Sequence, residues 1–461
     1  MGISIVQKSD LSKKKRNPKI ALVLAGGAVS GGAFKVGGLK ALNDFLLNRK
    51  VTEFDIYVGL SAGALLATPL AGGVSPEEML KSLDGTSNKF TQLRPLDFYY
   101  PNYKELIGRP LRLAAQYGLF LPTLIYDLLR AIPSMPGEVY DSFTRFLKDP
   151  TYTNFESMSK EVAMFVKPRR GVPSIFHGLP SGIFDNKLIE RYLRQNMAKN
   201  KMSNDFRELY KQTGKELYIP AMNLDTAERV VFGHDEVQDI PVSEAVYAST
   251  ALPGFYKPAR IRGIDYVDGG VRHTANIDIA IDHGADLIIC YNPFRPIHNR
   301  VEIEERKVNG RTEYVATRGT HLADQGVRTV LNQVFRTLLH SRLMVGIRKY
   351  VDNANFEGDI VLIEPQEQDA RFFDINPLAF WERARAAERG FESVKTSIER
   401  KYPQVRAILS SYGIETTRVY VEEDLRQMRR SGQQPGKVLQ VLEHEKPKVP
   451  LKVLRGSRKP S

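Results

Sequence analysis

The chain has 461 residues, of which 42% are hydrophobic, enough to bury the core of a large α/β domain. Its one cysteine, Cys290, excludes an internal disulfide framework and fits a reducing compartment. Because Cys290 lies in the apolar run DLIICYNP, we expect a buried strand residue rather than a reactive thiol. The formal net charge of +13 is concentrated at the two ends, since residues 1–19 and 435–461 each carry a net +5.

Both ends lack a sustained apolar period, so we predict basic disordered tails at 1–18 and 431–461. Such tails serve solubility alone, or they attract the chain to an anionic membrane surface at roughly 1 kcal/mol per basic residue. Nucleic acid is the weaker alternative, because no aromatic residues interleave the basic ones. No signal-peptide pattern is present, and the longest uncharged apolar stretch, 113–126, is too short to span a bilayer. We therefore expect a cytoplasmic protein, peripheral at a membrane surface at most.

Between the tails, short β-branched runs alternate with helical patterns, which is typical of a mostly parallel sheet covered by helices on both faces. The strand-like runs cover residues 19–25, 54–60, 217–223, 229–233, 265–270, 286–292 and 359–365. Helical patterns cover residues 32–48, 76–85, 321–350 and about 377–401. The long helix has apolar residues at helical spacing, which predicts core packing for Val327, Val330, Leu331 and Val334.

Residues 90–175 interrupt this alternation, because they are dense in Tyr, Phe and Leu. This segment is either a helical insertion packed on the core or a cap whose apolar face lines an acyl-chain pocket or touches lipid. We predict that residues 19–430 form one catalytic domain that contains this insertion and a helical C-terminal part at 321–430.

The pentapeptide GLSAG, residues 59–63, matches the G-x-S-x-G nucleophile elbow. In such an elbow a strained strand-to-helix turn exposes the serine hydroxyl, here that of Ser61, and Gly59 and Gly63 let the backbone turn tightly. The helix that follows points its positive end at the oxygen and stabilises a developing alkoxide. The alternative is a glycine-flanked turn serine without a catalytic role.

The glycine-rich segment LAGGAVSGGAFKVGGL, residues 24–39, follows the first predicted strand. A P-loop needs G-x-x-x-x-G-K-[ST] and a dinucleotide fingerprint needs G-x-G-x-x-G, and neither occurs here in register. What remains is a row of backbone N–H groups at a helix N-terminus, which stabilises negative charge, including the oxyanion of acyl transfer. Because the nucleophile elbow follows one strand later, we predict an oxyanion hole in this segment.

The segment DYVDGGVRHTANIDIA offers a base for the serine. Asp268 ends a short strand, and Gly269 and Gly270 allow a close approach and a sharp turn. A carboxylate about 2.6–3.2 Å from a serine hydroxyl can act directly as the general base. Two alternatives remain at this point: an ordinary turn, or a histidine base such as His273, five residues further on.

These three features, in this order, resemble the patatin-like phospholipase family, and similar segments at 220–233, 245–261 and 283–293 extend the resemblance over about 19–295. The resemblance implies a three-layer α/β fold with a mostly parallel central sheet. It also implies a Ser–Asp dyad without histidine, in which Ser61 attacks an ester carbonyl and Asp268 accepts its proton.

The family's oxyanion hole would fall on the backbone N–H groups of Gly26, Gly27 and Ala28, and the N–H of Ala62 is a geometric candidate as well. The glycine loop departs from the family's common form, G-G-G-x-[RK]-G. Its third glycine is Ala28, and no Arg or Lys precedes Gly31 or Gly32.

We therefore expect a serine hydrolase of fatty-acyl esters, phospholipids foremost, that forms an acyl-enzyme. No metal or cofactor is expected, since the sequence has no HExxH or paired CxxC spacing. The alternatives are an α/β-hydrolase-type esterase with a histidine base and a non-catalytic module that binds lipid surfaces. Nothing in the sequence indicates a lipid head group, a chain length or an oligomeric state.

Overall fold

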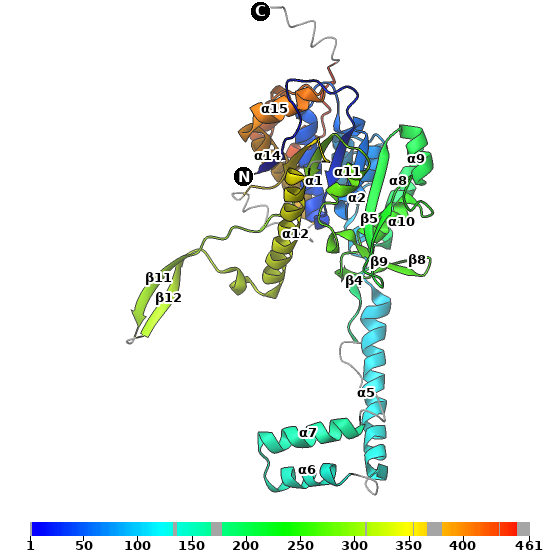
Figure 1. Cartoon of the computed structure of the whole chain (residues 1–461), viewed down its shortest axis with the longest axis vertical. Helices are drawn as coiled ribbons and strands as arrows, with labels where there is room; N and C mark the ends of the chain where they lie inside the picture. Colours follow the sequence, from blue (N-terminus) through cyan, green and yellow to red (C-terminus); the bar gives the residue numbers. More distant parts are fainter. Residues whose placement is uncertain are drawn as a thin grey trace, which may run out of the picture. The chain divides into compact units, whose positions relative to one another are not determined.

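The computed structural model describes residues 2–131, 136–166, 178–308, 311–353, 355–366, 380–432 and 434–449. The chain divides into two compact units: Met1–Tyr100 together with Asn186–Ser461, and Pro101–Asp185. The larger unit carries the central sheet, and the smaller unit is helical (Figure 1).

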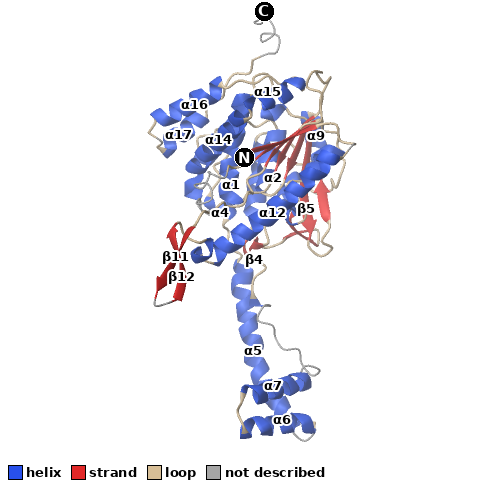
Figure 2. Cartoon of the chain, turned by 60° about the vertical axis from the view of Figure 1, so that its left-hand side comes forward, coloured by secondary structure: helices blue, strands red, loops and turns tan. Residues whose placement is uncertain are grey.

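The central sheet is mixed, with a parallel middle (Figure 2, red strands between blue helices). Its parallel strands lie in the order β13 (Asp359–Ile363), β10 (Leu287–Tyr291), β2 (Ile20–Leu24), β3 (Ile56–Gly59) and β5 (Glu216–Asn223). At one edge, β1 (Ile3–Val6) runs antiparallel to β13. At the other, β6 (Arg229–Phe232) and β9 (Ile264–Asp268) run antiparallel to β5, and β8 (Ala259–Ile261) follows β9. The predicted fold class, a mostly parallel sheet flanked by helices, is confirmed.

The middle strands are buried along their whole length, as their continuous apolar runs predict for parallel strands covered on both faces. Every residue of β2, β10 and β13 is buried. Cys290 lies inside β10, as expected, and burial raises the pKa of its thiol well above the usual range. The thiol is therefore a core side chain.

Helices cover both faces of the sheet. On one face, α11 (Ile277–Asp282) and the second half of α12 (Val327–Asp352) pack against alternate residues of the strands. On the other face lie α1 (Ala28–Phe45) and α2 (Ala62–Ala71), and α14 (Arg383–Arg400) packs along α1. α1 follows β2 and α2 follows β3, so both helices begin at the carboxyl ends of neighbouring parallel strands.

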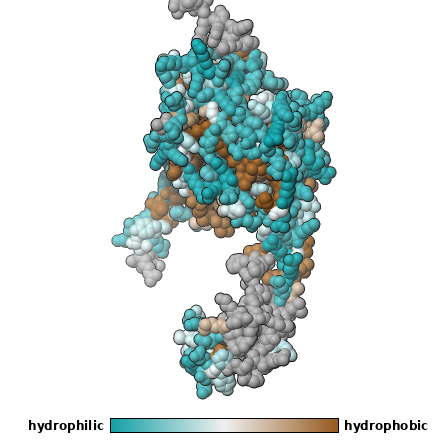
Figure 3. Space-filling view, turned by 45° about the vertical axis from the view of Figure 1, so that its right-hand side comes forward, coloured by the Kyte–Doolittle hydropathy of each residue, from teal (hydrophilic) through white to brown (hydrophobic). Residues whose placement is uncertain are grey.

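The remaining described elements of the larger unit surround these layers. Its other helices are α3 (Pro76–Asp84), α4 (Pro95–Phe98), α8 (Lys187–Lys199), α9 (Phe206–Thr213), α10 (Val242–Ser249), α15 (Tyr402–Ser411), α16 (Val419–Arg430) and α17 (Pro435–Leu442). Its other strands are β7 (Gly254–Tyr256) and the hairpin of β11 (Glu302–Val308) and β12 (Arg311–Arg318). The face of this unit seen in Figure 3 is largely hydrophilic at its rim, and hydrophobic residues gather towards its middle.

The smaller unit consists of α5 (Tyr103–Ala131), α6 (Gly137–Lys148), α7 (Tyr152–Val166) and the short strand β4 (Gly182–Phe184). α6 packs on α7, where the rings of Phe146 and Phe155 lie 5.7 Å apart. The side chain of Asn102 donates to the carbonyl of Gly182 and closes the base of the unit. Helices thus occupy much of the segment expected to be an insertion, but the compact unit starts and ends about ten residues later than 90–175. None of the described helices is both long and apolar enough to cross a bilayer.

Both predicted disordered tails contain ordered segments, so these predictions are wrong in part. Residues 3–6 form β1, because the four-residue run ISIV pairs with the open edge of β13. Residues 435–442 form α17, whose apolar side chains Val438, Leu439 and Leu442 are buried. The sequence did not predict these two elements, because an apolar run of four to eight residues shows little periodicity. The surface on which each run packs forms only when the chain folds. Residues 450–461 of the predicted C-terminal tail lie outside the described residues.

The predicted core face of α12 is also wrong. Val327 is 74% exposed and Leu331 50%, and Val330 and Val334 are exposed as well. The buried side chains of this helix come later, at Leu343 and Ile347. The helix has apolar residues on more than one side, so spacing alone selected the wrong stripe.

Candidate active site

Ser61 occupies a sharp turn between the end of β3 at Gly59 and the start of α2 at Ala62. Its backbone angles, φ 55° and ψ −127°, are rare for a residue with a side chain and cost about 1–3 kcal/mol. The turn is held by hydrogen bonds on both sides: the N–H of Leu60 donates to the carbonyl of Leu24 (3.0 Å), and the N–H of Gly63 donates to that of Leu60 (2.7 Å). This is the local geometry of a nucleophile elbow.

The two flanking glycines let α2 lie directly against the strands. A Cβ at position 63 would lie 2.1 Å from the carbonyl oxygen of Leu24, and one at position 59 would lie 2.6 Å from the Cα of Ala64. Neither position can hold a side chain without displacing backbone. The predicted role of Gly59 and Gly63, permitting a tight turn, therefore has a steric basis.

A buried serine that sequence reasoning missed supports the elbow from below. The hydroxyl of Ser249, the last residue of α10, accepts the backbone N–H of Ser61 (3.0 Å) and donates to the carbonyl of Pro220 in β5 (2.7 Å). Ser249 is fully buried. In the sequence, Ser249 belongs to the A-S-x-A-x-P segment within 245–261, which is part of the family resemblance but does not indicate what the serine does.

Asp268, the last residue of β9, lies buried beside Ser61. Its backbone N–H donates to the carbonyl of Ala251 (2.9 Å), and its carboxyl oxygen Oδ1 accepts the N–H of Gly270 (2.8 Å). Burial raises the pKa of Asp268 to about 6, against the lowering effect of hydrogen bonds from the Ser61 hydroxyl and Gly270 and of the positive charge of Lys35. A carboxyl with this pKa is ionised at neutral pH and is still able to accept a proton.

The glycines after Asp268 shape this turn. A Cβ on Gly269 would lie 2.8 Å from the carbonyl oxygen of Pro220, and one on Gly270 would lie 3.0 Å from Oδ1 of Asp268. The strand end therefore approaches β5 closely enough to bring a carboxyl of β9 to a serine 207 residues earlier in the chain.

The described histidines have their contacts elsewhere. The ring of His273 lies among Arg229, Asp278, Arg272 and Arg342, and burial and the arginines together lower its pKa. His283 contacts the carbonyl of Ile279. Among the described residues, no histidine has a hydrogen bond or ion pair with Ser61 or Asp268. His177 lies outside the described residues.

The glycine-rich loop connects β2 to α1 and borders the serine. A Cβ on Gly26 would lie 3.3 Å from the Cβ of Ser61, so this backbone is next to the serine. Gly27 and Ala28 follow at the N-terminus of α1, where the first N–H groups have no acceptor within the helix and the helix dipole is positive. Ala62 is the first residue of α2 and has the same property. The four predicted oxyanion donors thus belong to two helix starts on adjoining strands.

Phe294 is a second neighbour that the sequence did not single out. Its ring lies 3.0 Å from the position that a Cβ on Gly26 would take, and Pro293 lies similarly close to Gly27. Arg336 of α12 donates to the carbonyls of Pro293 and Arg295 and holds this segment. The aromatic ring therefore forms an apolar wall beside Ser61.

A small apolar cavity of about 60 Å³ is lined in part by Leu65 and Leu66 of α2, the helix that begins directly after Ser61. Its wall comes from α1, α2, α3 and α8, with Val36, Leu65, Leu66, Met79 and Leu193 among the lining residues. No group of three or more His, Cys, Asp or Glu side chains suited to a metal ion occurs within the described ranges. The surroundings of Ser61 thus combine backbone donors, one carboxyl and apolar walls.

Comparison with known proteins matches residues 22–281 to the family model of patatin-like phospholipases. The probable lipid hydrolase 463L of Invertebrate iridescent virus 6 is 28% identical over 104 residues, which are 22% of this chain. The chain spans 36% of the length of that curated relative.

Two solved structures are similar at low scores. VipD from Legionella pneumophila aligns over 95% of this chain and 82% of its own, with 14% identity and a TM-score of 0.34. Full-length ExoU from Pseudomonas aeruginosa, in complex with SpcU, aligns over 91% and 65%, with 15% identity and a TM-score of 0.27. The family model covers more than half of the chain, from β2 to α11, and includes the loop, the elbow and the carboxyl described above; the protein belongs to the patatin-like phospholipase family.

Proposed function

We propose that this protein is a serine acyl hydrolase that cleaves fatty-acyl esters of lipids, phospholipids foremost, with Ser61 as nucleophile and Asp268 as general base. The observation that carries the proposal is the strained serine whose hydroxyl lies beside a buried carboxyl with a pKa of about 6. Family membership supports a lipid ester as substrate.

In the first half of the reaction, Oγ of Ser61 attacks the ester carbonyl carbon while its proton moves to the carboxylate of Asp268. The negative charge on the carbonyl oxygen is stabilised by backbone N–H groups drawn from Gly26, Gly27, Ala28 and Ala62. The tetrahedral intermediate then collapses, the C–O bond to the alcohol breaks, and Asp268 returns the proton to the departing alkoxide. An acyl-enzyme and a free alcohol remain.

In the second half, Asp268 accepts a proton from water as the water oxygen attacks the acyl carbon. Collapse of this second intermediate breaks the bond to Ser61, which regains the proton, and the fatty acid leaves. Both halves need one base, one nucleophile and the same donors, so the mechanism needs no metal or cofactor.

We propose that the acyl chain packs against Phe294, whose ring lies next to Gly26, and enters the apolar cavity lined by Leu65 and Leu66 of α2. At about 60 Å³ the cavity holds only a few methylene groups, so a long chain requires side chains to move. Contact with an anionic membrane through exposed basic residues near the ends, such as Lys13 and Lys14, is part of the same proposal.

The test is hydrolysis of phospholipid vesicles and of a soluble acyl ester by the wild type, Ser61→Ala, Asp268→Asn and His273→Asn, together with labelling by a fluorophosphonate. We expect Ser61→Ala to lose both hydrolysis and labelling, Asp268→Asn to lose both almost entirely, and His273→Asn to keep both. Equal hydrolysis by wild type and Ser61→Ala refutes the proposal. Loss of labelling in His273→Asn but not in Asp268→Asn favours a histidine base instead.

Absence of labelling in the wild type, with binding to vesicles retained, favours the non-catalytic lipid-surface module. This outcome is distinguished from a misfolded sample by thermal unfolding of the same preparation.

A further inference from the structure

Lys35 is a fully buried lysine that the mechanism above does not use. It lies two turns into α1, and its side chain runs back towards the start of the helix, as helical side chains do. Its ammonium donates to the backbone carbonyls of Ala25 and Gly26, the latter at 3.3 Å. Among the described ion pairs, none includes Lys35. Both of its hydrogen-bond acceptors therefore belong to the glycine-rich loop.

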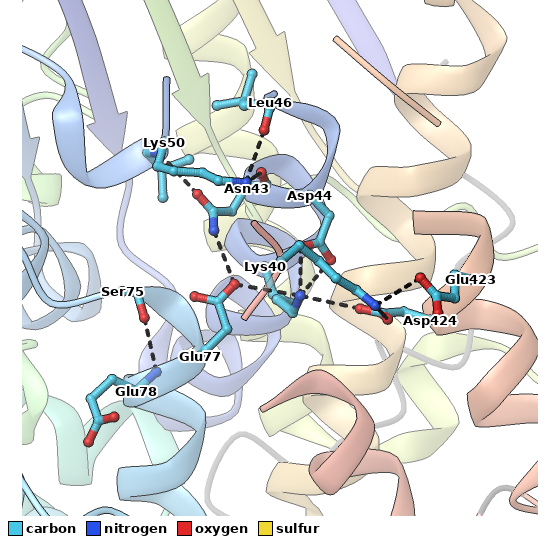
Figure 4. A network of polar contacts seen from close by, with 12 residues as sticks. Lys40, Asn43, Asp44, Leu46, Lys50, Ser75, Glu77, Glu78, Glu423 and Asp424 are labelled. Carbon is cyan, nitrogen blue, oxygen red and sulfur yellow. Dashed lines mark hydrogen bonds and ion pairs between the residues drawn. The ribbon is translucent and has the colours of Figure 1, made fainter. Parts of the chain in front are cut away.

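Lys40, five residues later on the same helix, provides a contrast. It is also fully buried, but it forms ion pairs with Asp44 at 2.6 Å, Asp424 at 3.2 Å and Glu77 at 3.5 Å (Figure 4). That lysine is satisfied by carboxylates from α1, α3 and α16, as expected of a buried charge with a structural role. Lys35 has no such neutralising shell.

The acceptors of Lys35 fix how the loop presents its donors. In a trans peptide the C=O and the following N–H point in opposite directions. Because the carbonyls of Ala25 and Gly26 both point at the Lys35 ammonium, the N–H groups of Gly26 and Gly27 point to the other side of the loop. Gly26 is also next to Ser61, because a Cβ on Gly26 would lie 3.3 Å from the Cβ of the serine.

The charge of Lys35 also reaches the site. Lys35 and Asp268 attract each other, and each shifts the pKa of the other through its charge. Burial lowers the pKa of Lys35 to about 7, and the attraction of Asp268 opposes this. In turn the lysine lowers the pKa of Asp268 and keeps its carboxylate available as a base.

We propose that Lys35 is a positioning residue of the active site, which orients the oxyanion loop through the carbonyls of Ala25 and Gly26 and supplies the positive charge that this loop lacks. The loop has no Arg or Lys before Gly31 or Gly32, and Lys35 provides a cation behind the loop from within α1. The inference rests on the proposed function, because it assigns Lys35 to the same acyl transfer at Ser61.

A structural role and a positioning role predict opposite effects on stability. If Lys35 were structural, Lys35→Met would destabilise the fold. Under the proposal, Lys35→Met removes a poorly compensated buried charge while keeping the apolar stem, so the melting temperature stays the same or rises. The number of active sites, counted by fluorophosphonate titration of Ser61, stays near that of the wild type.

Turnover and its pH dependence report the role itself. With a soluble acyl ester, we expect Lys35→Met to lower kcat per titrated site by about 10- to 100-fold, with little change in KM. This loss is smaller than the roughly 100- to 1000-fold that removal of an oxyanion donor itself costs, because Lys35 only orients the donors. The acid limb of the kcat profile should move to higher pH, because Asp268 loses the charge that lowers its pKa. Lys35→Gln keeps a donor but no charge, so it should recover part of kcat and show the same shift of the acid limb. Lys35→Arg should keep the limb of the wild type.

A kcat of Lys35→Met within about twofold of the wild type, with an unchanged acid limb, overturns the inference. Loss of folding in Lys35→Met together with an unshifted limb in Lys35→Gln also overturns it. If the wild type neither hydrolyses the ester nor takes up the label, the proposed function fails instead, so the two failures are distinguishable.

Discussion

Ser249 is the buried hydroxyl on which the nucleophile elbow rests, and its replacement by alanine should lower both stability and turnover. The hydroxyl accepts the N–H of Ser61 and donates to the carbonyl of Pro220. Alanine removes both hydrogen bonds without adding bulk. The substitution therefore tests the support of Ser61 and leaves Ser61 itself in place.

The size of the effect follows from the two bonds. The N–H of Ser61 loses its partner in a buried position, which costs about 1–3 kcal/mol, and the bond to Pro220 contributes a further ~1 kcal/mol. The free energy of unfolding should thus fall by roughly 2–4 kcal/mol. The N–H bond also opposes relaxation of the strained Ser61 backbone. If the Ser61 backbone relaxes and this adds about 1.4–2.7 kcal/mol to the activation barrier, kcat falls by about 10- to 100-fold.

Ser243→Ala is the matched control. Ser243 is a fully buried serine on the same helix, and its hydroxyl also has two partners, Asn204 and Glu190, away from the elbow. Thermal unfolding and kcat per fluorophosphonate-titrated site are measured for both variants. We expect similar losses of stability, and a loss of kcat in Ser249→Ala alone. Equal kcat values in the two variants would refute the idea that this hydrogen bond positions the nucleophile.

Four further predictions concern charge. The folded-state pKa of Asp268 is raised from 3.8 to about 6, so ionisation of this carboxyl opposes folding increasingly from pH 4 to 6. Above pH 6, Asp268→Asn should therefore raise the free energy of unfolding by up to roughly 3 kcal/mol. The same variant should have no turnover, and both effects are measured at pH 7 by unfolding and by ester hydrolysis. In the wild type, the acid limb of kcat/KM should have its midpoint near pH 6, and a midpoint near 4 would contradict the burial argument. Lys40→Met leaves three buried carboxylates without their shared cation and should lower the free energy of unfolding by about 3–5 kcal/mol with kcat per titrated site unchanged. Replacing exposed Lys13 and Lys14 together by Gln should weaken binding to anionic vesicles by roughly 1 kcal/mol per residue and leave zwitterionic vesicles unaffected, measured by co-sedimentation.

Sequence patterns predicted the parts of this protein that depend on local order. The strands β2, β3, β10 and β13 are continuous apolar runs, so their positions follow from the chain itself. The GLSAG turn was predicted because its glycines, strand and helix are adjacent in sequence. The proximity of Ser61 and Asp268 came only from resemblance, since nothing in the residues says that β3 and β9 both pair with β5.

The features that sequence patterns missed or assigned wrongly depend on tertiary partners. Lys35 lies between Phe34 and Val36 in an apolar stretch, and only the fold shows that its ammonium ends beneath the loop rather than in solvent. Ser249 is one of many serines until its hydroxyl is seen between Ser61 and Pro220. The stripe of α12 that spacing assigned to the core is exposed, because a helix with two apolar stripes packs only one of them.

Each of the three groups around the proposed reaction is held in a state that costs stability. Ser61 has a strained backbone, the Asp268 carboxylate is buried, and the Lys35 ammonium is buried without a carboxylate in contact. Burial shifts the pKa of Asp268 up and that of Lys35 down, so desolvation outweighs the attraction between them. Neutralising either one alone removes its own desolvation and also that attraction, whereas neutralising both loses the attraction only once. The double variant Lys35→Met/Asp268→Asn should therefore exceed the summed stability gains of the two single variants, and the excess measures how strongly Lys35 holds the charge of the base.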